Sequence, residues 1–197
     1  MSPYNIIYAD PPWNFKAWGK QGKKAPQNHY VCMTDEDIYS LPVSSIAAEN
    51  CALFMWATYP LLQEAFVTLS RWGFTYRTVA FTWVKTNKND KYHMGLGYWT
   101  RANPEICLLA TKGVIKRIDA GVRNLQVHKV REHSRKPDEI RGEIVRLLGD
   151  LPRIELFARS QTQGWDVFGN EVEGSIRLLT QREPDLKLES GKLSGSA

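Results

Sequence analysis

The four residues Asp10-Pro11-Pro12-Trp13 place the strongest local constraint on how this chain folds. Residues 5–9 before them form a short apolar run rich in β-branched and aromatic side chains, which predicts a buried strand. Neither proline has a backbone N–H and both fix φ, so the strand must end at Asp10. The turn presents a carboxylate, backbone carbonyls and a large ring at the carboxyl end of a strand. In open α/β sheets, ligands bind at that end.

These groups suit a planar ring that carries an exocyclic amino group. The Asp10 carboxylate and the Pro11 carbonyl can each accept one N–H of such an amine, and Trp13 can stack on the ring. Two acceptors draw the nitrogen lone pair out of conjugation and make it a better nucleophile. The alternative is an ordinary turn that ends a strand, with a helix-capping aspartate and a core tryptophan.

Five further segments accompany this turn along the chain. The turn and these segments resemble, in the same order, those of the MT-A70 family of adenine N6-methyltransferases, which use S-adenosylmethionine. The resemblance covers roughly residues 4–172. The segments are Trp83-Val84-Lys85-Thr86, Gly97-Tyr98-Trp99 with Glu105, His133 to Glu139, Ile154 to Arg159, and Trp165 with Gly169-Asn170. The resemblance implies direct transfer of a methyl group to adenine N6, with Asp10, Pro11, Pro12 and Trp13 as the catalytic residues.

The apolar patterning independently indicates an α/β protein. Continuous apolar runs predict strands, and apolar residues at helical spacing predict two amphipathic helices whose stripes belong to the core. A threonine followed by acids predicts a further short helix. The strands are expected at 51–56, 78–85, 106–110, 153–159 and 164–170, and the helices at 34–41, 58–73 (stripe Leu61, Leu62, Ala65, Phe66, Leu69) and 137–149.

The resemblance implies a single Rossmann-like methyltransferase domain with a doubly wound, mostly parallel sheet. Its motif order is permuted, because the catalytic turn comes first and the cofactor strand last. We expect this domain to span residues 1–173 and residues 174–197 to form a flexible tail. Residues 114–130 are basic and lack periodicity, which predicts irregular structure.

Site residues beyond the catalytic turn are assigned mainly by the resemblance. Lys136 precedes a helix N-terminus, where a cation gains nothing from the dipole, so a ligand is expected there. Glu155 lies in an apolar strand and needs a polar partner. The glycine-rich F-x-G-x-G cofactor turn is absent, so side chains must bind the cofactor. The cofactor residues are predicted to be Asp10, Lys136, Glu155, Arg159, Gln161, Asn170 and Glu171, and the substrate residues Lys85, Trp99 and Glu105.

Charge favours a nucleic-acid partner. The net charge is +5, and lysines are interleaved with aromatic residues in two loops, at 15–24 and 85–99. Solvated loops folded back on the domain are an equal alternative for this pattern. The short chain with no separate recognition module favours DNA. The alternatives are RNA, a catalytically inactive partner that binds nucleic acid, and a small-molecule amine; a homodimer is also expected.

Several classes are disfavoured. No stretch of 18 apolar residues and no leader-like segment is present, so we expect a cytoplasmic protein with no membrane partner. The three cysteines form no C-x-x-C pair and the four histidines have no close ligand spacing, which predicts free thiols and no metal site.

Overall fold

The computed structural model describes residues 3–13, 33–97, 99–176 and 178. Within these ranges, seven strands form one sheet in the order β5-β3-β4-β2-β1-β6-β7. The strands are β1 (Tyr4–Ala9), β2 (Ala47–Ala57), β3 (Thr75–Thr86), β4 (Glu105–Lys112), β5 (Leu125–Lys129), β6 (Arg153–Leu156) and β7 (Asp166–Phe168). The α-helices are α1 (Asp35–Ser40), α2 (Leu62–Arg71) and α3 (Glu139–Leu148), and short 3-10 turns are η2 (Val43–Ser45), η3 (Tyr59–Leu61) and η4 (Glu132–Ser134).

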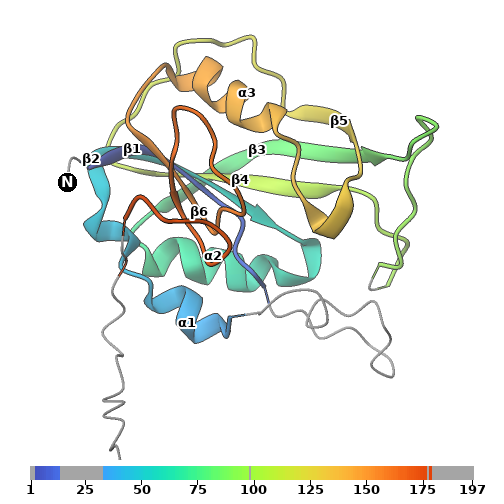
Figure 1. The fold of residues 1–197 in the computed structure, drawn as a ribbon, viewed down its shortest axis with the longest axis horizontal. Coiled ribbons are helices and arrows are strands. Elements are labelled where there is room, and N and C mark those ends of the chain that lie inside the picture. Colours follow the sequence, from blue (N-terminus) through green and yellow to red (C-terminus); the bar gives the residue numbers. More distant parts are fainter. Residues whose placement is uncertain (1–2, 14–32, 98, 177, 179–197) are drawn as a thin grey trace, which may run out of the picture.

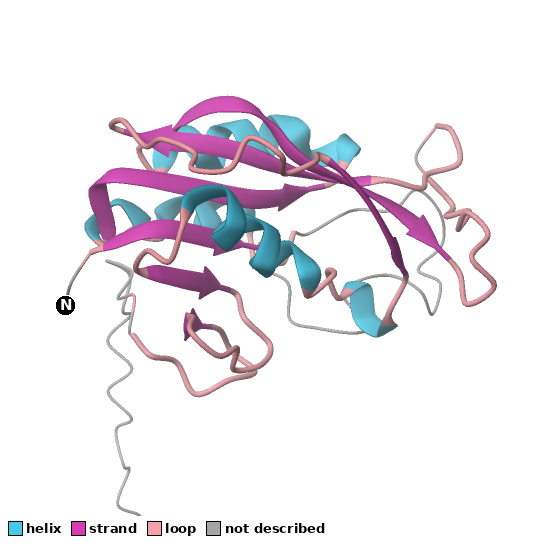
Figure 2. Ribbon diagram, turned by 90° about the horizontal axis from the view of Figure 1, so that it is seen from above, coloured by secondary structure: helices cyan, strands magenta, loops and turns pink. Residues whose placement is uncertain are grey.

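The helices cover both faces of the sheet (Figure 1). Buried side chains of α1 and α2 pack with one face of β1, β2, β4 and β6, and those of α3 pack with the other face of β1 and β2 and with β3. Figure 2 shows the same layers from above, with the sheet strongly twisted. The predicted doubly wound sheet is therefore confirmed.

All strand pairs are parallel except those of β4, which is antiparallel to β2 and β3. The carboxyl ends of the six parallel strands meet at one edge of the sheet, which we call the functional edge. Because β4 runs the other way, its first residue, Glu105, lies at that same edge. Residues 87–104, between β3 and β4, therefore begin and end at the functional edge.

The first strand and the late strand β6 are neighbours. Ala9 lies opposite Leu156 in the parallel register, although 147 residues separate them in the chain. Asp10 and Phe157 follow these two residues directly. The permuted order thus places the predicted catalytic turn, which begins at Asp10, beside the turn that follows β6 at Phe157 and Ala158.

The predicted helices and strands occur, with three corrections. Residues 125–129, expected to be irregular, form the edge strand β5. The strand expected at 153–159 ends at Leu156. Phe66, expected in the core, is 42% exposed and makes an edge-to-face contact with Tyr76 on the outer surface of α2.

The C-terminal part of the chain lies only partly within the described ranges. Ile176 is buried in the core on the α1 and α2 side, so residues up to this position still contact the domain. Residues 177 and 179–197 lie outside the described ranges, as does the basic loop at 15–24, and the division at residue 173 stays a prediction.

Other features of composition also have structural outcomes. Cys51 and Cys107 are free and buried, as predicted, while Cys32 lies outside the described residues. Burial raises the pKa of Cys51 to about 12. No helix in the described ranges has the length and apolar character needed to span a membrane, and these ranges hold no group of three metal-ligating side chains.

Candidate active site

The turn after β1 is tied to the core through Trp13. Its indole N–H donates to the carbonyl of Trp56 at 3.1 Å, and the side chain is only 7% exposed. The backbone N–H of Trp13 donates to the carbonyl of Pro11 at 2.8 Å. This bond occupies one lone pair of the Pro11 carbonyl oxygen, which retains a second lone pair. Stacking of Trp13 on a substrate stays a prediction.

The ammonium group of Lys136 lies against the carboxylate of Asp10. Nζ is 2.8 Å from Oδ1 and 2.8 Å from Oδ2, and it also donates to the carbonyl of Ser134 at 3.3 Å. The Lys136 side chain is 10% exposed, and Nζ is 5.6 Å from the ring centre of Trp56. Two residues that are 126 positions apart thus form a nearly buried ion pair at the functional edge.

Two further charged side chains extend this pair. Glu105 Oε2 lies 3.3 Å from the Lys136 ammonium, and Glu105 Oε1 accepts a hydrogen bond from Lys85 at 2.5 Å. The resulting row, which we call the charge row, alternates in sign in the order Asp10, Lys136, Glu105, Lys85. Glu105 was predicted to face substrate, and in the structure its 12% exposed side chain is held between the two lysines.

The pKa values of Lys136 and Glu105 favour the charged forms of these two side chains. Burial would lower the pKa of Lys136, but the charges of Asp10 and Glu105 outweigh burial and raise it. Burial would raise the pKa of Glu105, but Lys136 and Lys85 outweigh it and lower the pKa. Both shifts make Lys136 and Glu105 a stable ion pair within the row.

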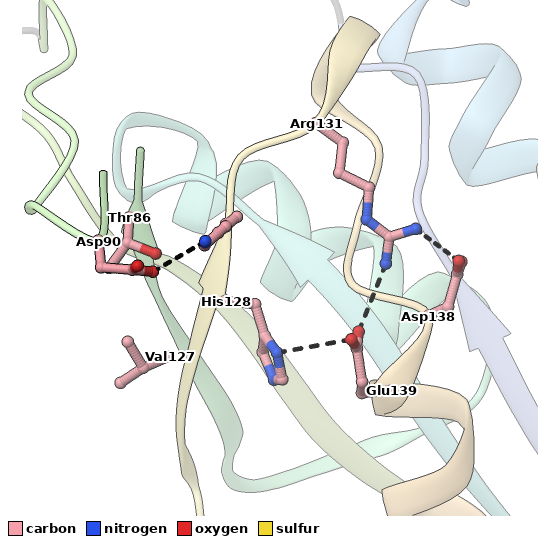
Figure 3. Close-up of a pocket in the computed structure, with 8 residues that line it drawn as sticks. Thr86, Asp90, Val127, His128, Arg131, Asp138 and Glu139 are labelled. Carbon is pink, nitrogen blue, oxygen red and sulfur yellow. Dashed lines mark hydrogen bonds and ion pairs between the residues drawn. The ribbon is translucent and has the colours of Figure 1, made fainter. Parts of the chain in front are cut away.

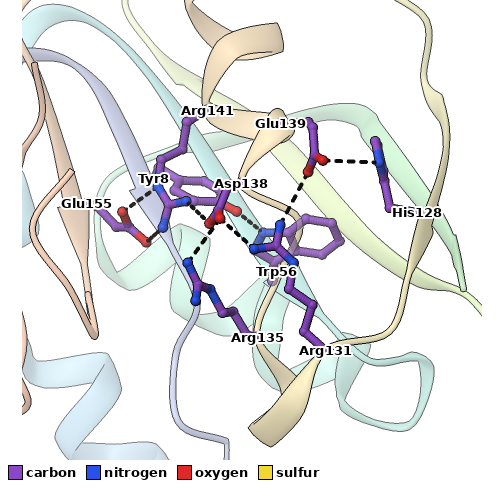
Figure 4. Close-up of polar contacts among 9 residues, drawn as sticks. All are labelled: Tyr8, Trp56, His128, Arg131, Arg135, Asp138, Glu139, Arg141 and Glu155. Atoms are coloured by element: carbon purple, nitrogen blue, oxygen red, sulfur yellow. Dashed lines mark hydrogen bonds and ion pairs between the residues drawn. The ribbon is translucent and has the colours of Figure 1, made fainter. Parts of the chain in front are cut away.

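A second cluster lies next to the row, between β6 and the start of α3 (Figure 4). Arg141 donates two hydrogen bonds of 2.7 Å to the two oxygens of Glu155. It donates a third, of 2.8 Å, to Asp138. The polar partner that Glu155 requires is therefore Arg141, and the role of Glu155 in cofactor binding stays a prediction.

Tyr8, Trp56, Asp138 and Arg141 complete the cluster and were not singled out from the sequence. The guanidinium of Arg141 lies 5.7 Å from the ring centre of Tyr8, whose hydroxyl oxygen accepts a 2.6 Å hydrogen bond from the indole of Trp56. Burial raises the pKa of Tyr8 well above its usual value, which keeps the phenol neutral. The i, i+3 spacing of Asp138 and Arg141 was the one local signal of this cluster.

The turn after β6 takes a backbone conformation that usually requires glycine. Phe157 has a φ of 63°, which is rare for a bulky residue. Gly169 approaches the backbone of Ala158 so closely that a Cβ would lie 2.0 Å from the Ala158 carbonyl oxygen. This approach ties the ends of β6 and β7 together, and Arg159 and Asn170 are the residues that follow the two contacting positions.

The other predicted site residues, Gln161, Glu171 and Trp99, are exposed at the surface. Gln161 is exposed and its side-chain amide donates to the carbonyl of Glu173 at 2.7 Å. Glu171 is exposed on the turn after β7. Trp99 lies in the segment between β3 and β4 with 92% of its side chain exposed.

An open cavity of about 720 Å³ lies beside these clusters, along β5 and the start of α3 (Figure 3). Its charges are paired with one another: Lys129 with Asp90, and Arg131 with Asp138 and Glu139. The ring of His128 lies 3.8 Å from the Glu139 carboxylate. The catalytic turn contributes none of the lining residues, so the cavity by itself does not identify the place of chemistry.

A carboxylate turn, a largely buried ammonium and a neighbouring tight turn lie together on one edge of a doubly wound sheet, which is where α/β proteins of this class bind their ligands. The model of the MT-A70 family matches residues 4–171, and the chain belongs to this family. Membership of this family, together with the relatives described in the next paragraph, supports S-adenosylmethionine-dependent methylation of adenine N6.

Two relatives differ in how much of their length the chain covers. The Type II methyltransferase M.MunI of Mycoplasma sp is 34% identical over 92% of this chain and 84% of that protein. The human N(6)-adenosine-methyltransferase catalytic subunit METTL3 is 30% identical over 94% of this chain, which spans only 30% of METTL3. A similar relative in Arabidopsis thaliana, described as N(6)-adenosine-methyltransferase MT-A70-like, is 31% identical over 25% of its length.

Proposed function

We propose that this chain transfers a methyl group from S-adenosylmethionine to N6 of adenine in DNA. The observation that carries the proposal is the pairing of the Asp10 carboxylate with the buried ammonium of Lys136 at the functional edge. The likeness to M.MunI over 84% of that protein favours DNA as the substrate. The adenosine methyltransferases, of which the chain spans a third or less, make RNA the second candidate.

The residues at the functional edge fit the cofactor. Its methionine end carries one carboxylate and one ammonium, and the edge offers the Lys136 ammonium and the Asp10 carboxylate side by side. Asn170 follows the turn that Gly169 holds against Ala158, where an amide can bind ribose hydroxyls. In this proposal Lys136 and Asn170 bind the cofactor, and Arg159 assists them from the neighbouring turn.

Asp10 acts on the target amine. One oxygen of Asp10 and the free lone pair of the Pro11 carbonyl each accept an N–H of the amino group, which turns the nitrogen lone pair out of the ring. When bound, S-adenosylmethionine would supply a methyl group on a sulfonium, which leaves as the neutral thioether of S-adenosylhomocysteine. Asp10 and the Pro11 carbonyl would hold the amine during the transfer, and the proton that becomes acidic after methylation would pass to water.

Positioning supplies most of the rate enhancement in this scheme. Good alignment of two bound reactants contributes roughly 7–11 kcal/mol, and no covalent intermediate with the enzyme is needed. The row of alternating charges holds Asp10 in one orientation because Lys136 binds both of its oxygens. An adenine in duplex DNA must first leave the stack, at a cost of a few kcal/mol.

The segment between β3 and β4 is suited to contact the nucleic acid. Its exposed aromatic and apolar side chains are flanked by cations that attract phosphates. The side chain of Asn103 braces the segment, because it donates to the carbonyls of Lys85 and His93 and accepts from the N–H of Lys85. The exposed side chains include Tyr92, Met94, Leu96 and Trp99, and the cations are Lys88, Lys91 and Arg101.

The test is a methylation assay with labelled S-adenosylmethionine on duplex DNA, single-stranded DNA and RNA, followed by digestion and mass spectrometry of the nucleosides. We expect N6-methyldeoxyadenosine from the wild type and none from Asp10→Ala. Asp119→Asn removes an exposed carboxylate far along the chain and serves as the control with full activity.

The outcomes separate the candidates. N6-methyladenosine from RNA alone would replace DNA by the second candidate. Activity that survives in Asp10→Ala would refute the mechanism. Binding of nucleic acid with no methylated nucleoside from any substrate would favour an inactive binding partner.

A further inference from the structure

Lys136 reaches Asp10 from a segment with little regular structure. Residues 130–138 connect β5 to α3 through the short turn η4, and Ser134 within it has a φ of 58°. A lysine has four side-chain torsions, so its ammonium finds a fixed target only if its backbone is held in place. Something in this segment must therefore fix the backbone around Lys136.

Asp138 is the acceptor that holds this segment. Its Oδ2 accepts hydrogen bonds from Arg131 at 2.5 Å and from Arg135 at 3.0 Å, and its Oδ1 accepts one from Arg141 at 2.8 Å. Two of these arginines precede Lys136 and the third follows it. One carboxylate therefore gathers both sides of the segment that carries the lysine, as Figure 4 shows.

The carboxylate of Asp138 does not serve the helix that begins beside it. Asp138 occupies the N-cap position of α3, where an aspartate commonly accepts an N–H of the first turn. Within the described part of the chain, its side chain makes no such capping bond. Both oxygens are used for the arginines instead, and Arg131 and Arg141 lower the pKa of Asp138 although burial opposes them.

Arg141 connects this carboxylate to the sheet. Its remaining N–H groups bind both oxygens of Glu155 in β6, and its guanidinium faces the ring of Tyr8 in β1. These are the two strands whose ends carry the catalytic turn and the predicted cofactor turn. The held segment is therefore fixed relative to the strand that presents Asp10.

We propose that Asp138 is a positioning residue that fixes the backbone around Lys136, so that the ammonium meets Asp10. The assignment rests on the proposed function only in that Lys136 contributes to the cofactor site. Asp138 itself contacts neither reactant and acts through Lys136.

The test is a double-mutant cycle on the binding of S-adenosylhomocysteine, measured by calorimetry. Asp138→Asn keeps the size of the side chain and weakens all three arginine contacts, and we expect affinity to fall about 10-fold. In the Lys136→Met background the same substitution should change affinity less than about 2-fold, because the residue it acts through is gone. Asp138→Glu, which keeps the charge, should recover part of the loss.

The matched control is Asp119→Asn. Asp119 accepts a 2.7 Å hydrogen bond from Arg146 of the same helix, α3, so this change also removes a carboxylate from an arginine of α3. We expect Asp119→Asn to bind S-adenosylhomocysteine as the wild type does. Arg135→Gln, which removes a single contact at an exposed arginine, gives a milder second variant should Asp138→Asn fail to fold, with an expected loss of about 2- to 5-fold.

Equal losses from Asp138→Asn in the wild-type and Lys136→Met backgrounds would overturn the proposal, as would an equal loss in the Asp119→Asn control. If Asp138→Asn cannot be tested, a wild-type affinity of Arg135→Gln would overturn it too. The cycle uses binding alone, so it is decided even if no nucleic acid is methylated. Absence of methylation with the expected coupling would refute the proposed function and leave the positioning role intact.

Discussion

The helices α1 and α3 begin in opposite ways. At α1, Thr34 accepts a hydrogen bond from the backbone N–H of Asp37, and three acids occupy the first turn, where the helix dipole favours negative charge. At α3, the N-cap aspartate makes no capping bond, and three arginines and a lysine gather where the dipole disfavours positive charge. The first start follows local rules and the second breaks them.

The difference distinguishes a helix start that serves stability from one that serves the proposed site. The start of α1 is capped by atoms within four residues, so its contribution to stability is local. The start of α3 is satisfied by Asp10 and Glu105 from the charge row and by Glu155 from β6, all far away in the chain. A local rule broken with long-range compensation is typical of a functional site.

Removing the cation from the start of α3 should have the largest effect. In Lys136→Met, Asp10 and Glu105 lose their common partner, and Asp10 loses both hydrogen bonds that orient it. We expect turnover to fall about 100-fold or more, measured as methyl transfer at saturating cofactor. Lys112→Met changes the same residue type at the other end of β4 and should retain activity. Turnover within a few-fold of wild type would remove Lys136 from the proposed mechanism.

Breaking the link between α3 and β6 should mainly reduce stability. Arg141→Met leaves the Glu155 carboxylate, whose side chain is 8% exposed, without its two hydrogen bonds. We expect the free energy of unfolding, from urea titration, to fall by about 3–5 kcal/mol. The double variant Arg141→Met, Glu155→Met should be more stable than the single one, because it removes the orphaned charge. A double variant that is still less stable would show that the buried charge is not the cause.

The start of α1 offers the contrasting test. Thr34→Ala removes the cap, and the free energy of unfolding should fall by about 1 kcal/mol with no change in methyl transfer. Ser40→Ala, at the exposed end of the same helix, is the control for loss of a hydroxyl. A loss of activity in Thr34→Ala beyond its loss of folded protein would show that the two helix starts are not separate in function.

The smallest expected effect is a change of slope with pH. The pKa of Glu105 is lowered below its usual 4.5 on folding, so its stabilising contribution is complete above that value and is lost as pH falls through the folded pKa. Between about pH 6 and pH 3, the free energy of unfolding should therefore fall more steeply with decreasing pH for the wild type than for Glu105→Gln. If the free energy of unfolding changes with pH in the same way in both proteins, Glu105 takes up its proton at the same pH in the folded and the unfolded state.

Local patterns were enough to predict most of the elements. The apolar run of β2, the stripe of α3 and the cap of α1 each depend on residues within a few positions of one another. The edge strand β5 was missed because it is short, half exposed and basic, and only its pairing with β3 makes it a strand. The reversed direction of β4 likewise depends on partners that no local pattern names.

The sequence indicated which residues belong to the candidate site better than it indicated which of them contact one another. The unusual position of Lys136 predicted a ligand, whereas its partner in the structure is the carboxylate of Asp10, 126 residues away. The need of Glu155 for a partner was foreseen, but Arg141 lies in a helix and only tertiary packing brings the two together. The conformation of Phe157 was not foreseen, because nothing in its side chain favours a positive φ.

The reversed direction of β4 has a consequence for how this scaffold can vary. The connection of residues 87–104 leaves and re-enters the sheet at the functional edge, so both of its attachment points lie beside the charge row. We expect changes of length in this connection to leave the pairing of the strands intact and, under the proposed function, to alter contacts with the nucleic acid.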